Sequence, residues 1–293
     1  TNFQHDYLSQ NNDTEVKTLR TNAAESGIAR DAGKHETSHQ IAMIQAAQII
    51  LLEHENVIDE AASAAMLRAI DTVHLAFQSS DAAVWTVVSD LEDRVNAALP
   101  TGIAGAASLG RTRSETISTA LRMQWRTQLA DIALRSLNLR GALHELAQAH
   151  TVTVMGAFAD RKAAAPSTLA HFLGGAIGPL ESTWNRLTAA IDSLDRSPMG
   201  SGLLVGEVFS TERTDAAKLL GFREPIENTL DASGAIEDLV EALEAVSAQA
   251  AIVQRFVNEL LIWIRTDPTS FFVDERWESV PEPAHPAHTV SNR

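Results

Sequence analysis

The chain has no cysteine among its 293 residues, and aromatic residues make up only 5% of it. The absence of cysteine excludes disulfides, thiolate catalysis and cysteine-ligated zinc or iron–sulfur centres. Ala and Leu dominate the hydrophobic 45%, a mixture that favours close helix packing over a sheet of β-branched and aromatic residues. The composition therefore predicts an all-α protein that is long enough to bury a substantial core.

Basic residues are also scarce, because 23 Lys and Arg stand against 38 Asp and Glu, a net charge of −15. This balance argues against nucleic acid as the main partner, since phosphate binding requires a basic face. A small anionic substrate is still compatible with it, because such a ligand responds to local charge. The sequence lacks a run of eighteen apolar residues, which argues against a membrane partner or span. It opens without a signal-peptide pattern, so we expect a cytoplasmic location.

Apolar residues at helical spacing follow a polar arm of about thirty residues. They predict helices from about His35, over residues 56–76, and from Ser80 or Asp81 to about Leu99. The small, Gly-rich stretch 101–110 predicts a domain boundary. We therefore expect an N-terminal helical domain with an irregular arm over residues 1–108, and a central long-helix bundle domain over residues 109–293.

Three much longer helices are predicted in that second domain. They run over about residues 114–149, from Pro166 at a first helical position to about residue 195 with a kink at Pro179, and over about residues 227–264. Helices of this length indicate an elongated bundle. The last one is apolar nearly all round at Leu260, Leu261, Trp263 and Ile264, which predicts obligate oligomerisation.

The most informative stretch is residues 197–231, which reads SPMGSGLLVGEVFSTERTDAAKLLGFREPIENTLD. Its small residues allow close approach of backbone and ligand. The stretch resembles the middle of an argininosuccinate lyase, a member of the aspartase/fumarase superfamily, and the resemblance covers roughly residues 35–275. It implies an aspartase/fumarase-like all-α fold, a homotetramer or dimer whose sites take residues from several subunits, and no organic cofactor or metal. By this resemblance we expect the chain to correspond to the first part of a family member, without the family's C-terminal domain.

A second stretch supports the resemblance, namely Gly110-Arg111-Thr112-Arg113-Ser114-Glu115-Thr116. Typical family members read G-R-S-R-N-D-Q there. The resemblance implies that Arg111, Thr112, Arg113 and Ser114 bind a substrate carboxylate, with Ser201 of the Gly-rich stretch lining the same pocket. Arg113 is suited to this because guanidinium holds carboxylate through two parallel hydrogen bonds. The alternative is that Arg111 and Arg113 only pair with acidic residues of neighbouring helices.

Three functional positions of the family hold different residues in this chain. The family's Thr-His pair corresponds to Ala159 and Asp160, and Asp160 could serve as a base or bind a cation; the alternative is a solvated charge beside Arg161 and Lys162. A substrate-contacting His of the family corresponds to Trp85. Tryptophan can stack on a flat or cationic group but exchanges no proton at neutral pH. The alternative for Trp85 is a buried core position.

The family's mobile catalytic loop, G-S-S-x-M-P-x-K-x-N-P, has no convincing match after the last long helix. His285, His288 and Ser291 could take over its proton chemistry, whereas a Pro- and His-rich terminus is also typical of a flexible tail. We therefore expect a diverged lyase that performs β-elimination, or the reverse addition, next to the carboxylate of a small substrate. Carbon–nitrogen cleavage that releases fumarate is the family form of this reaction. Two alternatives stay open: reuse of the scaffold for a non-eliminating reaction, and a non-catalytic binding subunit.

Overall fold

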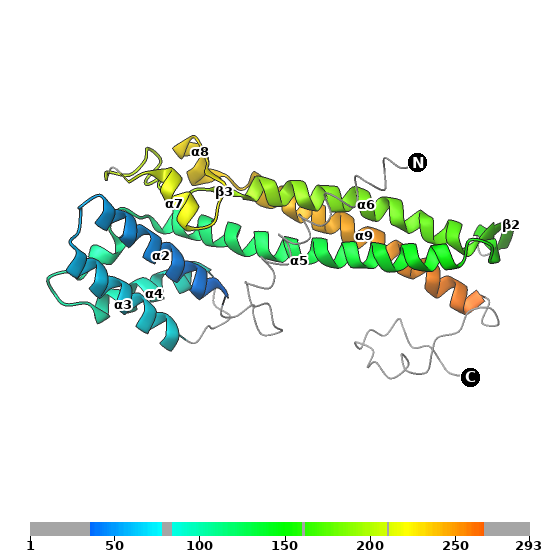
Figure 1. Cartoon of the computed structure of the whole chain (residues 1–293), viewed down its shortest axis with the longest axis horizontal. Coiled ribbons are helices and arrows are strands. Elements are labelled where there is room, and N and C mark those ends of the chain that lie inside the picture. The colour runs from blue at the N-terminus through cyan, green and yellow to red at the C-terminus, as the bar shows by residue number, and fades with distance from the viewer. Residues whose placement is uncertain (1–35, 78–83, 160–161, 210, 267–293) are drawn as a thin grey trace. The chain divides into compact units, whose positions relative to one another are not determined.

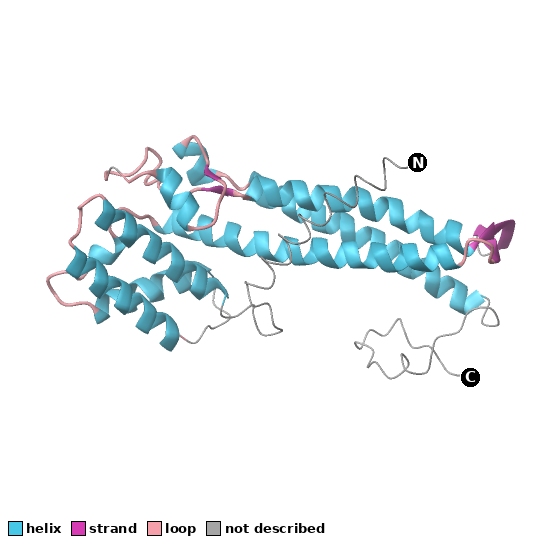
Figure 2. Cartoon of the chain, in the orientation of Figure 1, coloured by secondary structure: helices cyan, strands magenta, loops and turns pink. Residues whose placement is uncertain are grey.

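The computed structural model describes residues 36–77, 84–159, 162–209 and 211–266 (Figure 1). Helices account for most of them, and strands occur as two small pairs (Figure 2). The described residues up to Gly141 form a first compact unit together with those of 180–248, and the described residues of 142–179 form a second unit with 249–266. The prediction of an all-α fold is confirmed. The predicted boundary near residue 108 stays a prediction, and the polar arm lies outside the described residues.

The first unit begins with three helices, α2 (Glu36–His54), α3 (Glu60–Ala76) and α4 (Val84–Ala98). Ile41 and Ile44 of α2 lie in the core, where they pack with Val88 and Leu91 of α4, whereas Ile50 of the same apolar repeat is exposed. Helix α3 starts later than residue 56, because the Asp59 carboxylate accepts a hydrogen bond from the Ala62 N–H at 2.7 Å. A short 3-10 helix, η1 (Ala106–Ser108), then leads toward α5.

Helix α5 (Arg113–Ala149) has 37 residues and begins one position before the predicted start. The first-unit parts of α5, α6 (Leu169–Leu194) and α9 (Glu237–Thr266) run side by side (Figure 1) and share an apolar core. This core consists of Leu129, Ala133, Leu187, Ala190, Leu194, Ala242 and Ala245. The small Ala side chains let the three helix axes approach closely, as the Ala- and Leu-rich composition predicts.

Residues 227–264 do not form one helix, which corrects the prediction. Helix α8 (Thr229–Gly234) ends before Ala235, whose backbone is extended, and α9 starts anew at Glu237. The Asn228 side chain accepts from the N–H groups of Leu230 and Asp231 and so caps α8. The break persists because the Ala235 carbonyl accepts a hydrogen bond from Arg122 of α5 at 3.3 Å instead of continuing a helix.

The first unit also contains α7 (Arg213–Leu219) and the parallel pair β3 (Arg196–Ser197) and β4 (Glu224–Pro225). Helix α7 leads into a turn formed by Leu220, Gly221 and Phe222. Gly221 has a φ of +70°, a left-handed conformation that ends the helix, and the Phe222 N–H then donates to the Ala217 carbonyl at 2.8 Å. This turn leads the chain from α7 into β4, which then pairs with β3.

The second unit contains a hairpin that the sequence reasoning missed. Strands β1 (Val154–Ala159) and β2 (Lys162–Thr168) pair antiparallel, and Pro166 faces Gly156 within them. Pro166 is therefore not the first residue of a helix. The Thr168 hydroxyl accepts from the His171 N–H at 3.2 Å, so that Thr168 caps α6, which begins at Leu169. Pro179 lies inside α6 as expected.

Aromatic side chains form a contact between α6 and α9 in the second unit. The rings of Phe172 and Phe256 are stacked with centroids 5.7 Å apart, and Phe172 also contacts the buried Trp263. Leu261 on the same stretch of α9 stays 36% exposed. The oligomerisation inferred from this stretch stays a prediction. In the described part of the chain, every helix is too short or too polar to cross a membrane.

Candidate functional site

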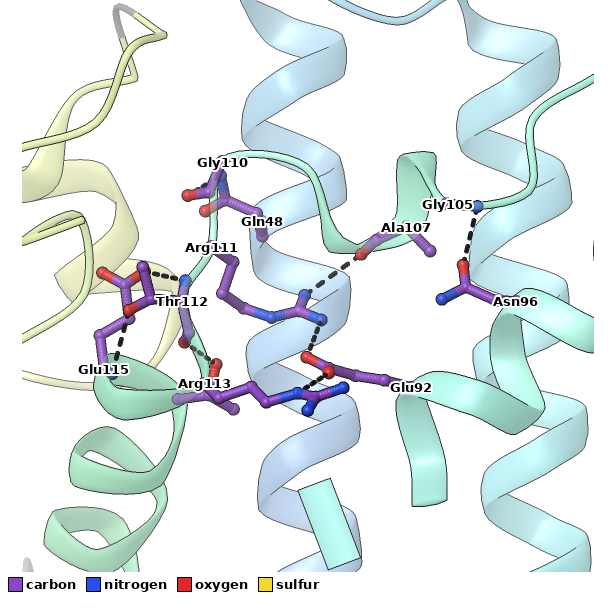
Figure 3. A network of polar contacts seen from close by, with 11 residues as sticks. Gln48, Glu92, Asn96, Gly105, Ala107, Gly110, Arg111, Thr112, Arg113 and Glu115 are labelled. Carbon is purple, nitrogen blue, oxygen red and sulfur yellow. Dashed lines mark hydrogen bonds and ion pairs between the residues drawn. The ribbon is translucent and has the colours of Figure 1, made fainter. Parts of the chain in front are cut away.

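The first unit holds a glutamate shared by two arginines (Figure 3). Glu92 of α4 accepts from Arg111 Nη2 at 3.3 Å and from Arg113 Nε at 2.8 Å. The side chains of Arg111 and Glu92 are 1% and 7% exposed, whereas the Arg113 side chain is 58% exposed. Two charges of one short turn thus converge on one buried carboxylate but face different surroundings.

The two arginines differ in what their environment does to the charge. Burial lowers the pKa of Arg111, and the Glu92 carboxylate is the largest opposing influence. For Arg113 the hydrogen bond to Glu92 raises the pKa, and the nearby Asp93 adds to this. Arg111 Nη1 also donates to the Ala107 carbonyl at 3.3 Å, so its guanidinium links the turn to η1. Arg113 contacts Glu92 through Nε, and its guanidinium terminus is the part suited to an external anion.

The start of α5 is a capping box, in which the residue before the helix and its third residue satisfy each other's backbone N–H groups. The Thr112 N–H donates to Glu115 Oε1, and the Glu115 N–H donates to the Thr112 hydroxyl at 3.3 Å. Glu115 is 1% exposed, and its second oxygen accepts from the Gly202 N–H at 3.1 Å and the Ser201 hydroxyl at 3.4 Å. Glu115 therefore joins residues 110–113, the arginine turn, to residues 200–206, the Gly-rich loop.

The Gly-rich loop is folded tightly against itself. Gly202 has a φ of +56°, and a Cβ there would lie 2.3 Å from the Gly206 carbonyl oxygen. Only glycine fits such a contact. Gly200 lies against the Arg213 side chain, whose guanidinium donates to the carbonyls of Ile226 at 2.6 Å and Glu227 at 3.0 Å. The close approach expected of the small residues is thus an approach of the backbone to itself and to Arg213.

A third carboxyl, the half-buried Glu207, lies beside the residue that precedes the two arginines. Glu207 Oε2 accepts from the Thr211 hydroxyl at 2.7 Å and from Gln48 Nε2 at 3.3 Å. The same Gln48 nitrogen donates to the Gly110 carbonyl at 3.2 Å. Burial is the main cause that raises the pKa of Glu207, and the Glu115 carboxyl raises it further.

The structure brings most of the predicted binding residues together. Arg111, Thr112, Arg113 and Ser114 share one turn, and Glu115 connects Ser201 to it. Pairing with an acid of a neighbouring helix, the alternative interpretation, holds for both arginines, yet Arg113 remains exposed. The hydroxyls of Thr112 and Ser201 are engaged with Glu115, and their contact with a substrate stays a prediction.

Trp85 lies in the first turn of α4 and is 66% exposed, so the alternative of a buried core position is wrong. It precedes Glu92 by about two helical turns and so lies on the same face of α4. Its role in stacking stays a prediction. The predicted catalytic residues Asp160, His285, His288 and Ser291 lie outside the described residues. In the described ranges, no three His, Asp or Glu side chains gather as they would around a metal ion.

Sequence reasoning missed Glu92, Gln48 and Glu207. For Glu92 a signal exists, because it interrupts the buried apolar face of α4 that Val88, Leu91 and Val95 define. A charged residue in such a face needs a charged partner. Gln48 is likewise buried on an apolar face of α2 at 1% exposure. Glu207 has no comparable local pattern.

Comparison with known proteins assigns this fold to a family. A family model described as "Lyase" matches residues 15–277, and the chain belongs to that family, in the aspartase/fumarase superfamily. More particularly, its curated relatives include argininosuccinate lyases, which confirms the resemblance. One from Shouchella clausii is 32% identical over 236 residues, covering 78% of this chain and 47% of the relative. Another from Methanocorpusculum labreanum is 30% identical over 223 residues, covering 75% and 45%.

The chain spans about half the length of the curated relatives it matches. Solved structures confirm the fold. An EDDS lyase in complex with formate superposes with a TM-score of 0.71 at 21% identity, covering 80% of this chain and 46% of that one. A class II fumarase from Schistosoma mansoni gives a TM-score of 0.65 at 15% identity, covering 83% and 61%.

Proposed function

We propose that this chain carries the carboxylate-binding part of a lyase that performs β-elimination, or the reverse addition, next to a carboxylate. The supporting observation is Arg113, whose Nε is fixed by the buried Glu92 while 58% of the side chain remains exposed. A guanidinium held at one edge offers its remaining N–H groups in a preorganised fork, which suits a carboxylate. The substrate in this proposal is a small carboxylate of the succinyl type.

The position of Arg113 at the first residue of α5 supports the same ligand. A helix N-terminus carries partial positive charge and unpaired N–H groups, so an anion is favoured there. Ser114 follows in the same turn, exposed, and its hydroxyl is available to a carboxylate bound by Arg113. Trp85 completes the proposed site as an exposed surface on which a flat leaving group can stack.

The proposed reaction has a defined balance. A base takes the proton from the carbon next to the carboxylate. The electron pair of this carbon–hydrogen bond forms the carbon–carbon double bond, and the carbon–nitrogen bond on the adjacent carbon breaks. The nitrogen receives a proton from an acid, and fumarate is the other product when the substrate is a succinyl amine. A positioned acid or base contributes typically ~10²- to 10⁴-fold to such a step. Asp160, His285, His288 and Ser291 remain the proposed proton-transfer groups.

A homotetramer or dimer in the cytoplasm is part of the proposal, and it rests on the family and on the apolar end of α9. Reuse of the scaffold for another reaction, and a non-catalytic binding role, are alternatives to it. Each predicts a different response to dicarboxylates. Binding without turnover is expected of a binding subunit, and absence of binding is expected of a reused scaffold.

The test is thermal unfolding in a concentration series of fumarate, succinate and argininosuccinate, followed by an assay for fumarate release. A ligand that binds only the folded state stabilises by about 2.7 kcal/mol at a hundred times its dissociation constant. We expect stabilisation that disappears in Arg113→Ala. The matched control is Arg135→Ala, because Arg135 of the same helix donates through Nε to Asp131 at 2.7 Å and its side chain is also mostly exposed. An unchanged ligand response in Arg113→Ala would overturn the proposal.

A further inference from the structure

Glu207 is a half-buried carboxyl with one fully buried oxygen, and the proposed reaction does not use it. Its Oε2 accepts from Thr211 and Gln48, whereas its Oε1 is buried and, among the described residues, has no hydrogen-bond partner. A buried carboxylate oxygen without a donor is costly when it is charged, and it is far less costly when the carboxyl is protonated. The geometry around Glu207 thus favours its neutral form.

The groups that face Glu207 come from every surrounding element. Helix α2 presents the neutral Gln48, and α5 presents the buried carboxylate of Glu115, which opposes a second negative charge. The turn before α5 presents Arg111, and α7 presents Arg213, both of which favour the ionised form. Burial and the Glu115 charge outweigh these cations, because the resulting pKa of Glu207 lies above its ordinary value of 4.5.

The Gln48 side chain also connects Glu207 to the backbone of the arginine turn. Gln48 Nε2 donates both to Glu207 Oε2 and to the carbonyl of Gly110, the residue before Arg111. Gly110 has a φ of +67°, and a Cβ built on it would lie 2.7 Å from Gln48 Nε2 and 3.3 Å from Glu207 Oε2. The Glu207 carboxyl and the Gln48 amide are therefore packed directly against the residue that precedes Arg111.

We propose that Glu207 is a positioning residue for the arginine turn and that binding of a carboxylate at Arg113 is coupled to uptake of a proton by Glu207. The inference rests on the proposed function, since it requires a carboxylate site at Arg113. The coupling has a simple electrostatic origin. A ligand carboxylate adds negative charge to a network that already holds Glu115 and Glu207, and like charges favour the protonated form of a carboxyl. Carboxylate affinity therefore falls as the pH rises through the titration of Glu207.

The experiment is calorimetric titration of the full chain with succinate, from about pH 5 to about pH 8, in pairs of buffers with different ionisation heats; affinities are expressed for the succinate dianion, and the protons exchanged by succinate itself are subtracted. The buffer dependence gives the number of protons taken up per succinate. We expect uptake of a fraction of one proton in the wild type and a fall in affinity of up to about tenfold across the range. In Glu207→Gln we expect no uptake and an affinity that stays flat with pH.

Two further variants make the result specific. Glu212→Gln is the matched control, because Glu212 is exposed and makes no side-chain cap hydrogen bond at the start of α7. It should behave as the wild type. Thr211→Val removes a donor that favours ionised Glu207, so the uptake should move to higher pH.

Proton uptake that persists unchanged in Glu207→Gln would overturn the coupling, and so would succinate binding without any uptake in the wild type. Absence of succinate binding at every pH would overturn the proposed function together with the coupling. The two failures are therefore distinguishable. Thermal unfolding of each variant without ligand shows whether it folds. If Glu207→Gln fails to fold, the shift of proton uptake in Thr211→Val supplies the test.

Discussion

Helix α5 carries two arginines that form the same kind of ion pair in two different surroundings. Arg113 Nε and Glu92 Oε2 lie 2.8 Å apart, and so do Arg122 Nη1 and Asp238 Oδ2. The Arg113 side chain is 58% exposed, whereas Arg122 is completely buried. The ion-pair distance is therefore no guide to role, and the surroundings must decide it.

The two arginines differ in what their remaining N–H groups contact. Arg122 also donates to the Ala235 carbonyl, which lies at the break between α8 and α9. Its partner Asp238 also lies 3.6 Å from Arg196, so the pair holds several segments of the first unit together. Arg113 leaves the end of its guanidinium in solvent at a helix N-terminus. We infer that Arg122 serves the fold and that Arg113 serves a ligand.

The largest effect is expected at the buried pair. Arg122→Met should lower the free energy of unfolding by about 3–5 kcal/mol, because it leaves the partly buried Asp238 carboxylate without its main partner. Urea unfolding measures this. Arg122→Met combined with Asp238→Leu should recover much of the loss, since replacing both partners removes the unpaired charge. A loss in the single variant no larger than that of Arg135→Met would contradict the assignment of Arg122 to the fold.

An intermediate effect is expected at Glu92, because it pairs with the buried Arg111 and also with the exposed Arg113. Glu92→Gln should cost about 1–3 kcal/mol of unfolding free energy, because the buried Arg111 loses its carboxylate partner. It should also weaken succinate binding, because Arg113 loses the acceptor that orients it. Urea unfolding and calorimetry measure the two effects separately. Asp131→Asn, which changes the partner of the exposed Arg135, is the control and should change neither.

The sequence predicted the long helices because their apolar spacing is a local signal that extends over many turns. It failed where a non-local contact decides the local structure. The hairpin of β1 and β2 depends on the pairing of residues such as Gly156 and Pro166, and the Ala-rich stretch before Pro166 shows no period that requires a strand. The break at Ala235 depends on a hydrogen bond from Arg122 of another helix.

The candidate site divides in the same way. Arg111 through Ser114 were predicted together because they are contiguous and follow a recognisable pattern. Glu92, the partner of both arginines, lies 19 and 21 positions before them on another helix, and the hydrogen-bonded Gln48 and Glu207 are separated by 159 positions. Nothing in a single sequence pairs such residues. The buried Glu115 was within the recognised motif, but only the structure shows that it links α5 to Gly202.

A smaller effect is expected from Glu207→Gln in the absence of ligand. Burial raises the pKa of Glu207, so the folded chain keeps a proton at pH values where the unfolded chain has lost it. The stability that this proton supplies is fully present below the ordinary carboxyl pKa and is lost as the pH rises through the raised folded value. The variant cannot undergo this loss. We expect the difference in unfolding free energy between wild type and variant to change between about pH 5 and about pH 8, in favour of the variant at the higher pH. A pH-independent difference would contradict this sign.

The smallest effect on stability is expected from replacing Arg113 by lysine, and the sharpest contrast comes from the same change at Arg122 of the same helix. Lysine keeps the charge but lacks the planar fork and the Nε donor. Arg113→Lys should leave urea unfolding unchanged, since the side chain is solvated, and should lower succinate affinity by about tenfold through loss of the second parallel hydrogen bond. Arg122→Lys should instead lower stability, because one ammonium cannot reach both Asp238 and the Ala235 carbonyl as the guanidinium does. Arg135→Lys should affect neither quantity. If Arg113→Lys changed stability as much as Arg122→Lys and left succinate binding intact, the division between a structural and a ligand-binding arginine on this helix would be wrong.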